Sequence, residues 1–284
     1  IADQVFSELS RHHIHTIFNN KSTVEYKEAL SPYQLKWLKQ YFDNRIIRHI
    51  TPIIINNNTN LADSLEDDAI YFLTALNKDD ETTYALVEIP REEENRFIVL
   101  PTQGTKKEKY ITLLDDVVRY FIDDIFKSFF DYDSIEAYSL KLTRDAEYNV
   151  TDELDQSLLD KMSKGIKQRL KADVVRLVYD KHIPEYMLKF LRKSLKIRDQ
   201  EQLEAGTNYR SFKDFMGFPN LGRKNLEWPS FSALDSKPFL AYPSIFDAIT
   251  QQDILLYYPY YKFKHFTEFV RQASYDPKVS EIKI

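Results

Sequence analysis

The sequence of 284 residues predicts a mixed α+β protein, and three observations lead to that fold class. Short apolar runs in the first half of the chain have the length of strands and lie close together. Further along, strand-like runs alternate with four-residue apolar spacing, which is typical of helices. An irregular stretch over 208–243 separates this part from a compact final segment. This order predicts an antiparallel meander followed by alternating strands and helices.

The first part of the chain, 1–58, is expected to be helical. Apolar spacing predicts a helix over 1–18. A second helix begins at Ser31, where Gln34 completes a capping box, and it continues to about residue 49. The polar run 56–60 predicts a loop and a domain boundary.

The middle part, 59–225, is expected to form one α+β domain. Polar residues 77–80 predict a hairpin turn between its first two strands. The predicted elements are strands over 70–73, 84–89 and 97–100, a helix over 112–129, a strand over 135–143, a helix over 152–170, a strand over 174–179 and a helix over 184–195.

The last part, 226–284, is expected to contain a linker and one βαβ unit. Its predicted elements are a strand over 253–256, a helix over 262–273 and a strand over 279–284. Two parallel strands cannot bury both of their faces. We therefore expect the rest of this sheet to follow residue 284, and the chain to be a fragment of a longer protein.

Composition restricts the classes of function. The formal net charge is −5, which argues against a general nucleic-acid-binding protein. The chain has no cysteine, so disulfides, thiolate metal sites and a cysteine nucleophile are excluded. Neither of the two standard glycine-rich phosphate-binding motifs occurs. No apolar run approaches the ~20 residues of a membrane-spanning helix, and we expect a cytoplasmic protein.

Two clusters of ionisable residues are interpreted as structural. His12, His13 and His15 lie on the first predicted helix, and solvated histidines are favoured over a metal site, which usually needs three or four ligands. The aspartate pairs 115–116 and 123–124 fall opposite the apolar stripe of their predicted helix, where solvated charges are expected. No metal site is therefore predicted.

Four residues are candidates for contact with a ligand. Arg144 follows a predicted strand and is expected either to form an ion pair or to bind a phosphate chain. Tyr257 and Tyr258 follow the first strand of the predicted βαβ unit, where ligands of open parallel sheets gather. Lys283 lies on the second strand, near the same edge. The alternative for the tyrosines is a role in packing.

Several sequence motifs resemble those of bacterial polyphosphate kinases. They are D-I-L-L-Y-Y-P-Y at 253–260, V-R-Q-A-S at 270–274, D-P at 276–277 and I-K-I at 282–284, preceded by T-R-D-A-E at 143–147, K-G-I-K-Q-R at 164–169, V-R-L at 175–177, F-P-N-L at 218–221 and I-F-D-A-I at 245–249. The order and spacing of these motifs are similar to those of the family over nearly the whole chain. After Thr51-Pro52 the sequence departs from the family, which usually has a His-Pro-Phe-type run there.

The resemblance implies the end of a helical N-terminal domain, then a middle or head domain, then the start of a phospholipase-D-like domain. It implies an enzyme that reversibly transfers the γ-phosphate of ATP to inorganic polyphosphate through a phosphohistidine, with magnesium. It also implies a homo-oligomer formed through the head domain, with peripheral attachment to the inner membrane left open. The nucleophilic histidine of the family lies beyond residue 284, so no catalytic residue is expected here, and neither ATP nor Mg²⁺ is expected to bind this chain alone.

Two other classes of function stay open at this point. One is a different hydrolase of the phospholipase D superfamily, which would carry H-x-K motifs further along its chain. The other is a non-catalytic module for self-association.

Overall fold

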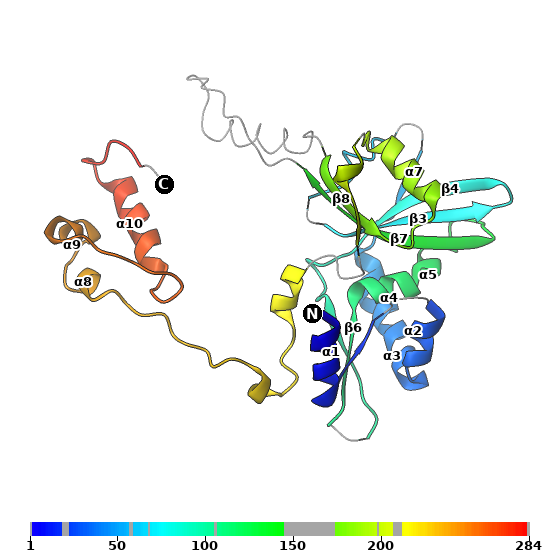
Figure 1. Ribbon diagram of the computed structural model, residues 1–284, viewed down its shortest axis with the longest axis horizontal. Coiled ribbons are helices and arrows are strands. Elements are labelled where there is room, and N and C mark those ends of the chain that lie inside the picture. Colours follow the sequence, from blue (N-terminus) through cyan, green and yellow to red (C-terminus); the bar gives the residue numbers. More distant parts are fainter. Residues whose placement is uncertain are drawn as a thin grey trace. The chain divides into compact units, whose positions relative to one another are not determined.

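The computed structural model describes residues 2–18, 23–56, 59–67, 69–104, 107–144, 174–197, 199–206 and 212–282. The chain divides into two compact units, Ile1–Leu221 and Gly222–Ile284, and each is described by itself (Figure 1). The predicted helix over 152–170 and the candidate residue Lys283 lie outside the described residues.

The first unit contains a six-stranded sheet with the strand order β2-β4-β3-β7-β8-β9. Neighbouring strands are antiparallel, except for β8 and β9, which are parallel. The predicted hairpin turn between β3 and β4 is present, with Asp79 in the left-handed region at a φ of 49°. The strands are β2 (Ile53–Ile55), β3 (Tyr71–Lys78), β4 (Glu81–Glu88), β7 (Ser134–Arg144), β8 (Val174–Asp180) and β9 (Leu203–Gly206).

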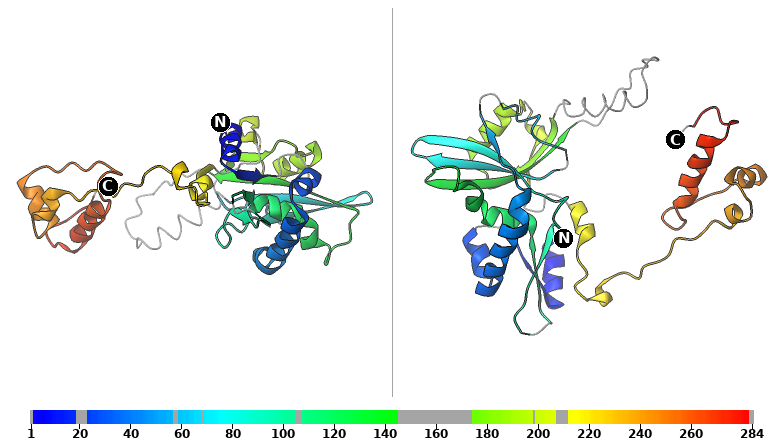
Figure 2. Two further views of the ribbon diagram at one scale, coloured as in Figure 1. Left: turned by 90° about the horizontal axis from the view of Figure 1, so that it is seen from below. Right: turned by 180° about the vertical axis from the view of Figure 1, so that it is seen from behind.

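Helices cover both faces of this sheet, because its central strands are apolar on both sides. On β3, Phe72 and Leu76 belong to one buried cluster, whereas Leu73 and Ala75 belong to another. Successive side chains of a strand point to opposite faces, so a single strand contributes to two cores. Figures 1 and 2 show α7 on one side of the sheet and α4 and α5 on the other. The helices of this unit are α1 (Ala2–Arg11), α2 (Thr23–Ala29), α3 (Pro32–Tyr41), α4 (Leu114–Tyr120), α5 (Ile122–Phe126) and α7 (Glu185–Ser194).

A second, smaller sheet has the order β1-β6-β5, with β1 (Ile14–Ile17) parallel to β6 (Lys109–Leu113) and β5 (Phe97–Leu100) antiparallel to it. The prediction of one helix over 1–18 is therefore wrong beyond Arg11. The backbone of His13 has a φ of 63°, which no α-helix tolerates, and the following residues pair with β6 instead.

The start of α3 is confirmed as predicted. The Ser31 hydroxyl accepts a hydrogen bond from the Gln34 backbone at 3.2 Å, and the Ser31 backbone donates to the Gln34 side chain at 3.0 Å. The helical path continues through a π-helical turn, Phe42–Ile46, and a 3-10 turn, Ile47–His49. Helix α2 and strand β2 were not predicted.

The predicted helix over 112–129 is only partly right. Its first residues belong to β6, and the helical part divides into α4 and α5 at Phe121, where the φ and ψ values are −98° and 19°. The other predicted strands and the helix over 184–195 in the described residues are confirmed within a few residues.

The second unit consists of short helices and irregular chain. They are the 3-10 turn Lys224–Leu226, α8 (Lys237–Leu240), α9 (Ile245–Gln251) and α10 (Lys264–Tyr275). The predicted helix over 262–273 is confirmed by α10. The flanking strands predicted over 253–256 and 279–284 do not form among the described residues. Leu255 is 88% exposed, and no strand of the described residues pairs with its segment. No helix in the described part of the chain is long and apolar enough to span a bilayer.

Candidate functional site

The aromatic turn at Tyr257–Tyr260 carries two of the four candidate ligand residues. The Tyr257 and Tyr260 rings stack with centroids 5.2 Å apart, and Phe231 stacks on Tyr260 at 5.4 Å. All three side chains are exposed, and Tyr257 is 66% exposed. Tyr258 differs: its ring packs edge-on against Phe263 at 5.2 Å, and its buried hydroxyl has no hydrogen-bond partner. The turn therefore presents Tyr257 to solvent and directs Tyr258 inward.

Backbone and side-chain hydrogen bonds attach this turn and the following Lys262 to Leu234 and Asp235. The Leu234 backbone donates to Tyr260 at 2.8 Å and accepts from Lys262 at 2.9 Å. The Lys262 ammonium also binds Asp235 at 2.5 Å, and this hydrogen bond lowers the pKa of the Asp235 carboxyl. The aromatic turn is thus held in place within the second unit.

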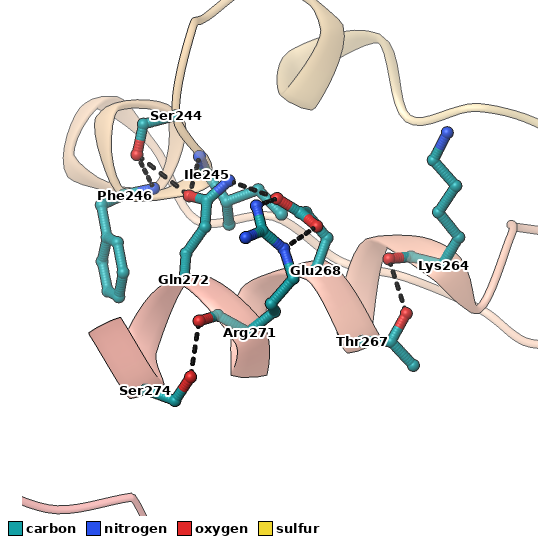
Figure 3. A network of polar contacts seen from close by, with 9 residues as sticks. All are labelled: Ser244, Ile245, Phe246, Lys264, Thr267, Glu268, Arg271, Gln272 and Ser274. Carbon is teal, nitrogen blue, oxygen red and sulfur yellow. Dashed lines mark hydrogen bonds and ion pairs between the residues drawn. The ribbon is translucent and has the colours of Figure 1, made fainter. Parts of the chain in front are cut away.

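Two of the sequence motifs meet where α10 crosses the start of α9, as Figure 3 shows. The Gln272 side-chain oxygen accepts from the Ile245 backbone at 3.0 Å and from the Ser244 hydroxyl at 3.1 Å. This satisfies a donor at the N-terminus of α9 that has no partner within the helix. The Gln272 amide in turn donates to Glu268 at 2.9 Å, and Arg271 binds the same carboxylate through two nitrogens. These hydrogen bonds, that of Arg271 first, lower the pKa of Glu268 to about 2.

Arg144, the candidate in the first unit, is buried and only 3% exposed. Its guanidinium binds Asp67 at 3.1 Å and the carbonyl of Leu65 at 2.8 Å, and it also donates to the carbonyl of Ala62. The Arg144 backbone donates to Asp67 as well, at 3.2 Å. The ion pair that was one of the two expectations is therefore present, and it anchors the segment 61–67 to the end of β7.

The sequence interpretation of the aspartates is corrected in part. Asp115 and Asp116 are each only 5% exposed, although both were expected to be solvated. The Arg96 guanidinium binds Asp115 in a bidentate manner, at 2.9 and 3.3 Å, and this partner makes burial possible. Asp123 is exposed as expected, and it accepts from the Tyr132 hydroxyl at 2.8 Å.

Arg96 also joins a cluster that the sequence did not indicate. It binds Asp214, at 2.8 Å, and Arg91 binds the same carboxylate oxygen at 3.0 Å. More than a hundred residues separate Asp214 from both arginines, so local patterns gave no signal for the contact. A cavity of about 340 Å³ lies beside this cluster.

The histidines do not form a metal site. His13 and His15 contact the two oxygens of Glu108 at 2.9 and 2.6 Å, and the hydrogen bond from His15 contributes most to lowering the pKa of Glu108. His15 lies on β1, so it does not share a helix face with His12. Among the residues that the structure describes, no group of three or more histidine and carboxylate side chains could hold a metal ion. The described residues therefore do not fit a magnesium site.

Comparison with protein families gives a match over most of the chain. A model of the polyphosphate kinase middle domain matches residues 33–218, and a model of polyphosphate kinase C-terminal domain 1 matches residues 244–284. The chain belongs to the polyphosphate kinase family. The resemblance drawn from the motifs is thereby confirmed.

Curated relatives agree with this membership. A polyphosphate kinase from Vibrio cholerae is 47% identical over 255 residues, which are 90% of this chain and 36% of the relative. A polyphosphate kinase from Escherichia coli K12 is 42% identical over 285 residues, covering 100% of this chain and 41% of the relative. The chain thus spans about two fifths of the length of the curated polyphosphate kinases it matches.

A solved structure shows the same fold. The crystal structure of polyphosphate kinase from Porphyromonas gingivalis has a TM-score of 0.64 and is 23% identical, and the match covers 97% of this chain and 38% of that one. The mixed α+β class is confirmed. The three-domain division at 58 and 225 stays a prediction, as do the ligand roles of Tyr257, Tyr258, Lys283 and Arg144.

Proposed function

We propose that this chain is part of a polyphosphate kinase that reversibly transfers the γ-phosphate of ATP to inorganic polyphosphate. The observation that carries the proposal is the paired match to the middle domain and to C-terminal domain 1, in that order, along one chain. In the proposed reaction a histidine would take the γ-phosphoryl group of ATP and release ADP, and the terminal phosphate of the polymer would then attack this phosphorus and release the histidine. Bound magnesium would supply stabilisation of the charge on the phosphates.

We further propose that residues 1–284 alone do not form the phosphohistidine. The surroundings of their six histidines support this, because five of the side chains lie within 4 Å of a carboxylate, which repels a phosphate chain. The contacts are His12 with Glu8 at 3.7 Å, His13 with Glu108 at 2.9 Å, His15 with Glu108 at 2.6 Å, His182 with Asp180 at 3.2 Å and His265 with Asp235 at 3.6 Å.

The remaining histidine, His49, is exposed, and its Nε2 accepts a hydrogen bond from Arg48 at 3.1 Å. This hydrogen bond makes the Nε2 atom of His49 a weaker nucleophile. His265 is also protected, because it is 5% exposed and its Nε2 accepts from the Ser236 backbone at 2.9 Å. A nucleophilic histidine needs an available ring nitrogen, and the contacts of these six side chains support the proposal that another histidine is the nucleophile.

Labelling with γ-³²P ATP and magnesium tests both statements. We expect the complete enzyme to retain label on an acid-labile, base-stable bond and to extend polyphosphate, and residues 1–284 to retain none. The Escherichia coli relative serves as a positive control. Label on residues 1–284 would refute their proposed inactivity, and the absence of both label and polymer from the complete enzyme would refute the proposed kinase activity.

We also propose that the head domain mediates self-association in the cytoplasm, as the family resemblance implies. A supporting feature is a cavity of about 900 Å³ that is lined by Ile122 and Ile135 of the head together with Val24 of the preceding helical part, and Val24 is 62% exposed. Light scattering after size exclusion should give the mass of a dimer for residues 1–284. A monomer for the wild-type chain at micromolar concentration would contradict the proposal, and a dimer that Val24→Glu leaves intact would contradict the use of this surface.

A further inference from the structure

The segment 212–221 is the last part of the first unit, and the second unit begins at Gly222. We propose that Asp214 is a positioning residue, which holds this segment against the head through Arg91 and Arg96 and so fixes the point at which the chain leaves the head. The inference rests on the proposed kinase function, because it concerns how the parts of that enzyme are placed.

The ionic contact has a definite geometry. A single oxygen of Asp214, Oδ2, accepts from Nη1 of Arg91 at 3.0 Å and from Nη1 of Arg96 at 2.8 Å. The Asp214 side chain is 20% exposed and that of Arg96 is 4% exposed. Water therefore screens these charges less than it screens a surface pair, and hydrogen bonds between charged groups are among the stronger ones.

The Arg96 guanidinium is also held by a second carboxylate, that of Asp115. Its Nε and Nη2 bind Asp115 on α4, which leaves Nη1 directed toward the segment 212–221. The backbone of Leu114 also donates to the Arg96 carbonyl at 2.8 Å, which connects β5 to the start of α4. A guanidinium held at two nitrogens loses little further freedom when a third forms a bond, so the contact is specific in direction.

Aromatic contacts hold the same segment on the same side. The rings of Phe215 and Phe218 meet the ring of Phe97 edge-on, with centroids 5.0 and 5.1 Å away. Phe97 directly follows Arg96, so the charged and aromatic contacts act on one point of β5. Phe6 of α1 lies 6.0 Å from Phe215, which brings the first helix of the chain to the same cluster. Met216, between the contacting residues, is 88% exposed and serves as a comparison.

The consequence follows from where the chain goes next. In the proposed enzyme the chain that leaves the head continues into the part that matches C-terminal domain 1, and small displacements of reacting groups cost much of the rate of a phosphoryl transfer. A fixed exit point limits where the second unit can begin. Asp214 touches no substrate in this proposal and acts only through the segment that it holds.

The first experiment measures the exit point directly. The chain contains no cysteine, so spin labels attach only to introduced thiols, here Val99→Cys on β5 and Asn220→Cys at the exposed end of the segment 212–221, both within the first unit. The distance distribution between the labels should be narrow in the otherwise unchanged chain, and about two-fold wider with Asp214→Asn, since the segment then opens locally. Asp214→Glu should restore much of the narrow distribution, and Met216→Ala should change nothing. Arg91→Gln removes the second arginine that binds Asp214 and should also widen the distance distribution. This variant tests the contact even if Asp214→Asn folds poorly.

The second experiment measures turnover in the complete enzyme. Asp214→Asn should lower kcat about 10-fold or more while KM for ATP stays within about two-fold, because positioning and not binding is lost. An unchanged distance distribution, or a wider one with unchanged kcat, would overturn the proposal. If the unaltered enzyme makes no polyphosphate, both the proposed function and the positioning role are overturned. The spin-label distances would still show whether Asp214 holds the segment 212–221 against the head.

Discussion

Replacing Arg144 by methionine should destabilise the first unit strongly. The side chain is buried, and its guanidinium binds Asp67 and the carbonyls of Leu65 and Ala62. Methionine is unbranched and has no donors, so the variant removes the hydrogen bonds and keeps an apolar side chain where the aliphatic part of Arg144 packs. Asp67 and both carbonyls then lose a partner at a site that water reaches poorly.

The magnitude follows from these contacts. Removing one partner of a buried ion pair costs about 3–5 kcal/mol, since the other charge stays behind. Asp67 keeps a side-chain exposure of 16%, which allows some hydration. The Arg144 Nε is buried without an acceptor, a cost that the variant removes. The hydration of Asp67 and the removal of the unpaired Nε both reduce the cost of the substitution. We therefore expect the free energy of unfolding to fall by about 3 kcal/mol, the lower bound of that range.

Urea unfolding followed by tryptophan fluorescence and circular dichroism measures this loss. With a slope of about 3 kcal/mol per molar urea, the midpoint should fall by about 1 M. Arg176→Met is the matched control on the neighbouring strand β8, because its pair with Glu204 is about half exposed on both sides and should contribute less than about 1 kcal/mol. Equal losses for the two variants would refute the reasoning that burial sets the cost at Arg144.

Three further predictions concern other parts of the chain. Gln272→Ala should remove the acceptor of the Ile245 amide at the N-terminus of α9 and cost the second unit about 1 kcal/mol. The loss should be visible as faster hydrogen exchange of the Ile245 amide, and an unchanged rate would contradict the role of this contact. The pKa of Glu268 is lowered from 4.5 to about 2, so its stabilising contact with Arg271 should be complete above pH 4.5 and lost as the pH falls toward 2. The carboxyl carbon shift of Glu268 in NMR should titrate in that lower range, and in Arg271→Met the pKa of Glu268 should return toward 4.5. Phe42→Ala should cost about 3–5 kcal/mol in urea unfolding of the first unit, since Phe42 is fully buried and stacks on Phe121, and a loss below about 1 kcal/mol would contradict its place in the core.

The parts of the fold that the sequence predicted well are set by local interactions. The capping box at Ser31 involves residues three apart, and strand β5 is a short apolar run with turn residues on either side. In both cases the chemistry that decides the structure lies within a few residues. The sequence alone was sufficient there.

The errors occur where a distant segment decides the structure. Ile14 and Ile17 are three residues apart, which is the spacing of a helix, and only the pairing of this segment with β6 makes it a strand. Asp115 was expected in solvent, because no local sequence pattern indicates that the Arg96 side chain binds it. The run 253–256 has the composition of a strand but no neighbouring strand to pair with among the described residues. A strand-like composition is therefore not sufficient for a strand, because a β-strand also needs a second strand to pair with.

The candidate site was predicted unevenly for the same reason. The ion pair of Arg144 was one of two expectations, whereas the sequence left open whether Tyr257 lines a ligand site or packs. The inward direction of Tyr258 was not predicted, because it depends on packing against Phe263. The contact of Asp214 with two arginines joins residues more than a hundred positions apart, and only the folded chain reveals it.

The pairing of β1 with β6 also affects how the protein is made. His15 on β1 meets Glu108, which is 93 residues later in the chain. At a synthesis rate of about 5–20 residues per second, the ribosome needs roughly 5–20 s to deliver that partner. During this interval β1 has an unpaired edge with the apolar side chains of Ile14 and Ile17, which are buried in the finished protein. The nascent chain therefore has a period in which a chaperone that binds short apolar segments would find β1 available, and the emergence of β6 ends that period.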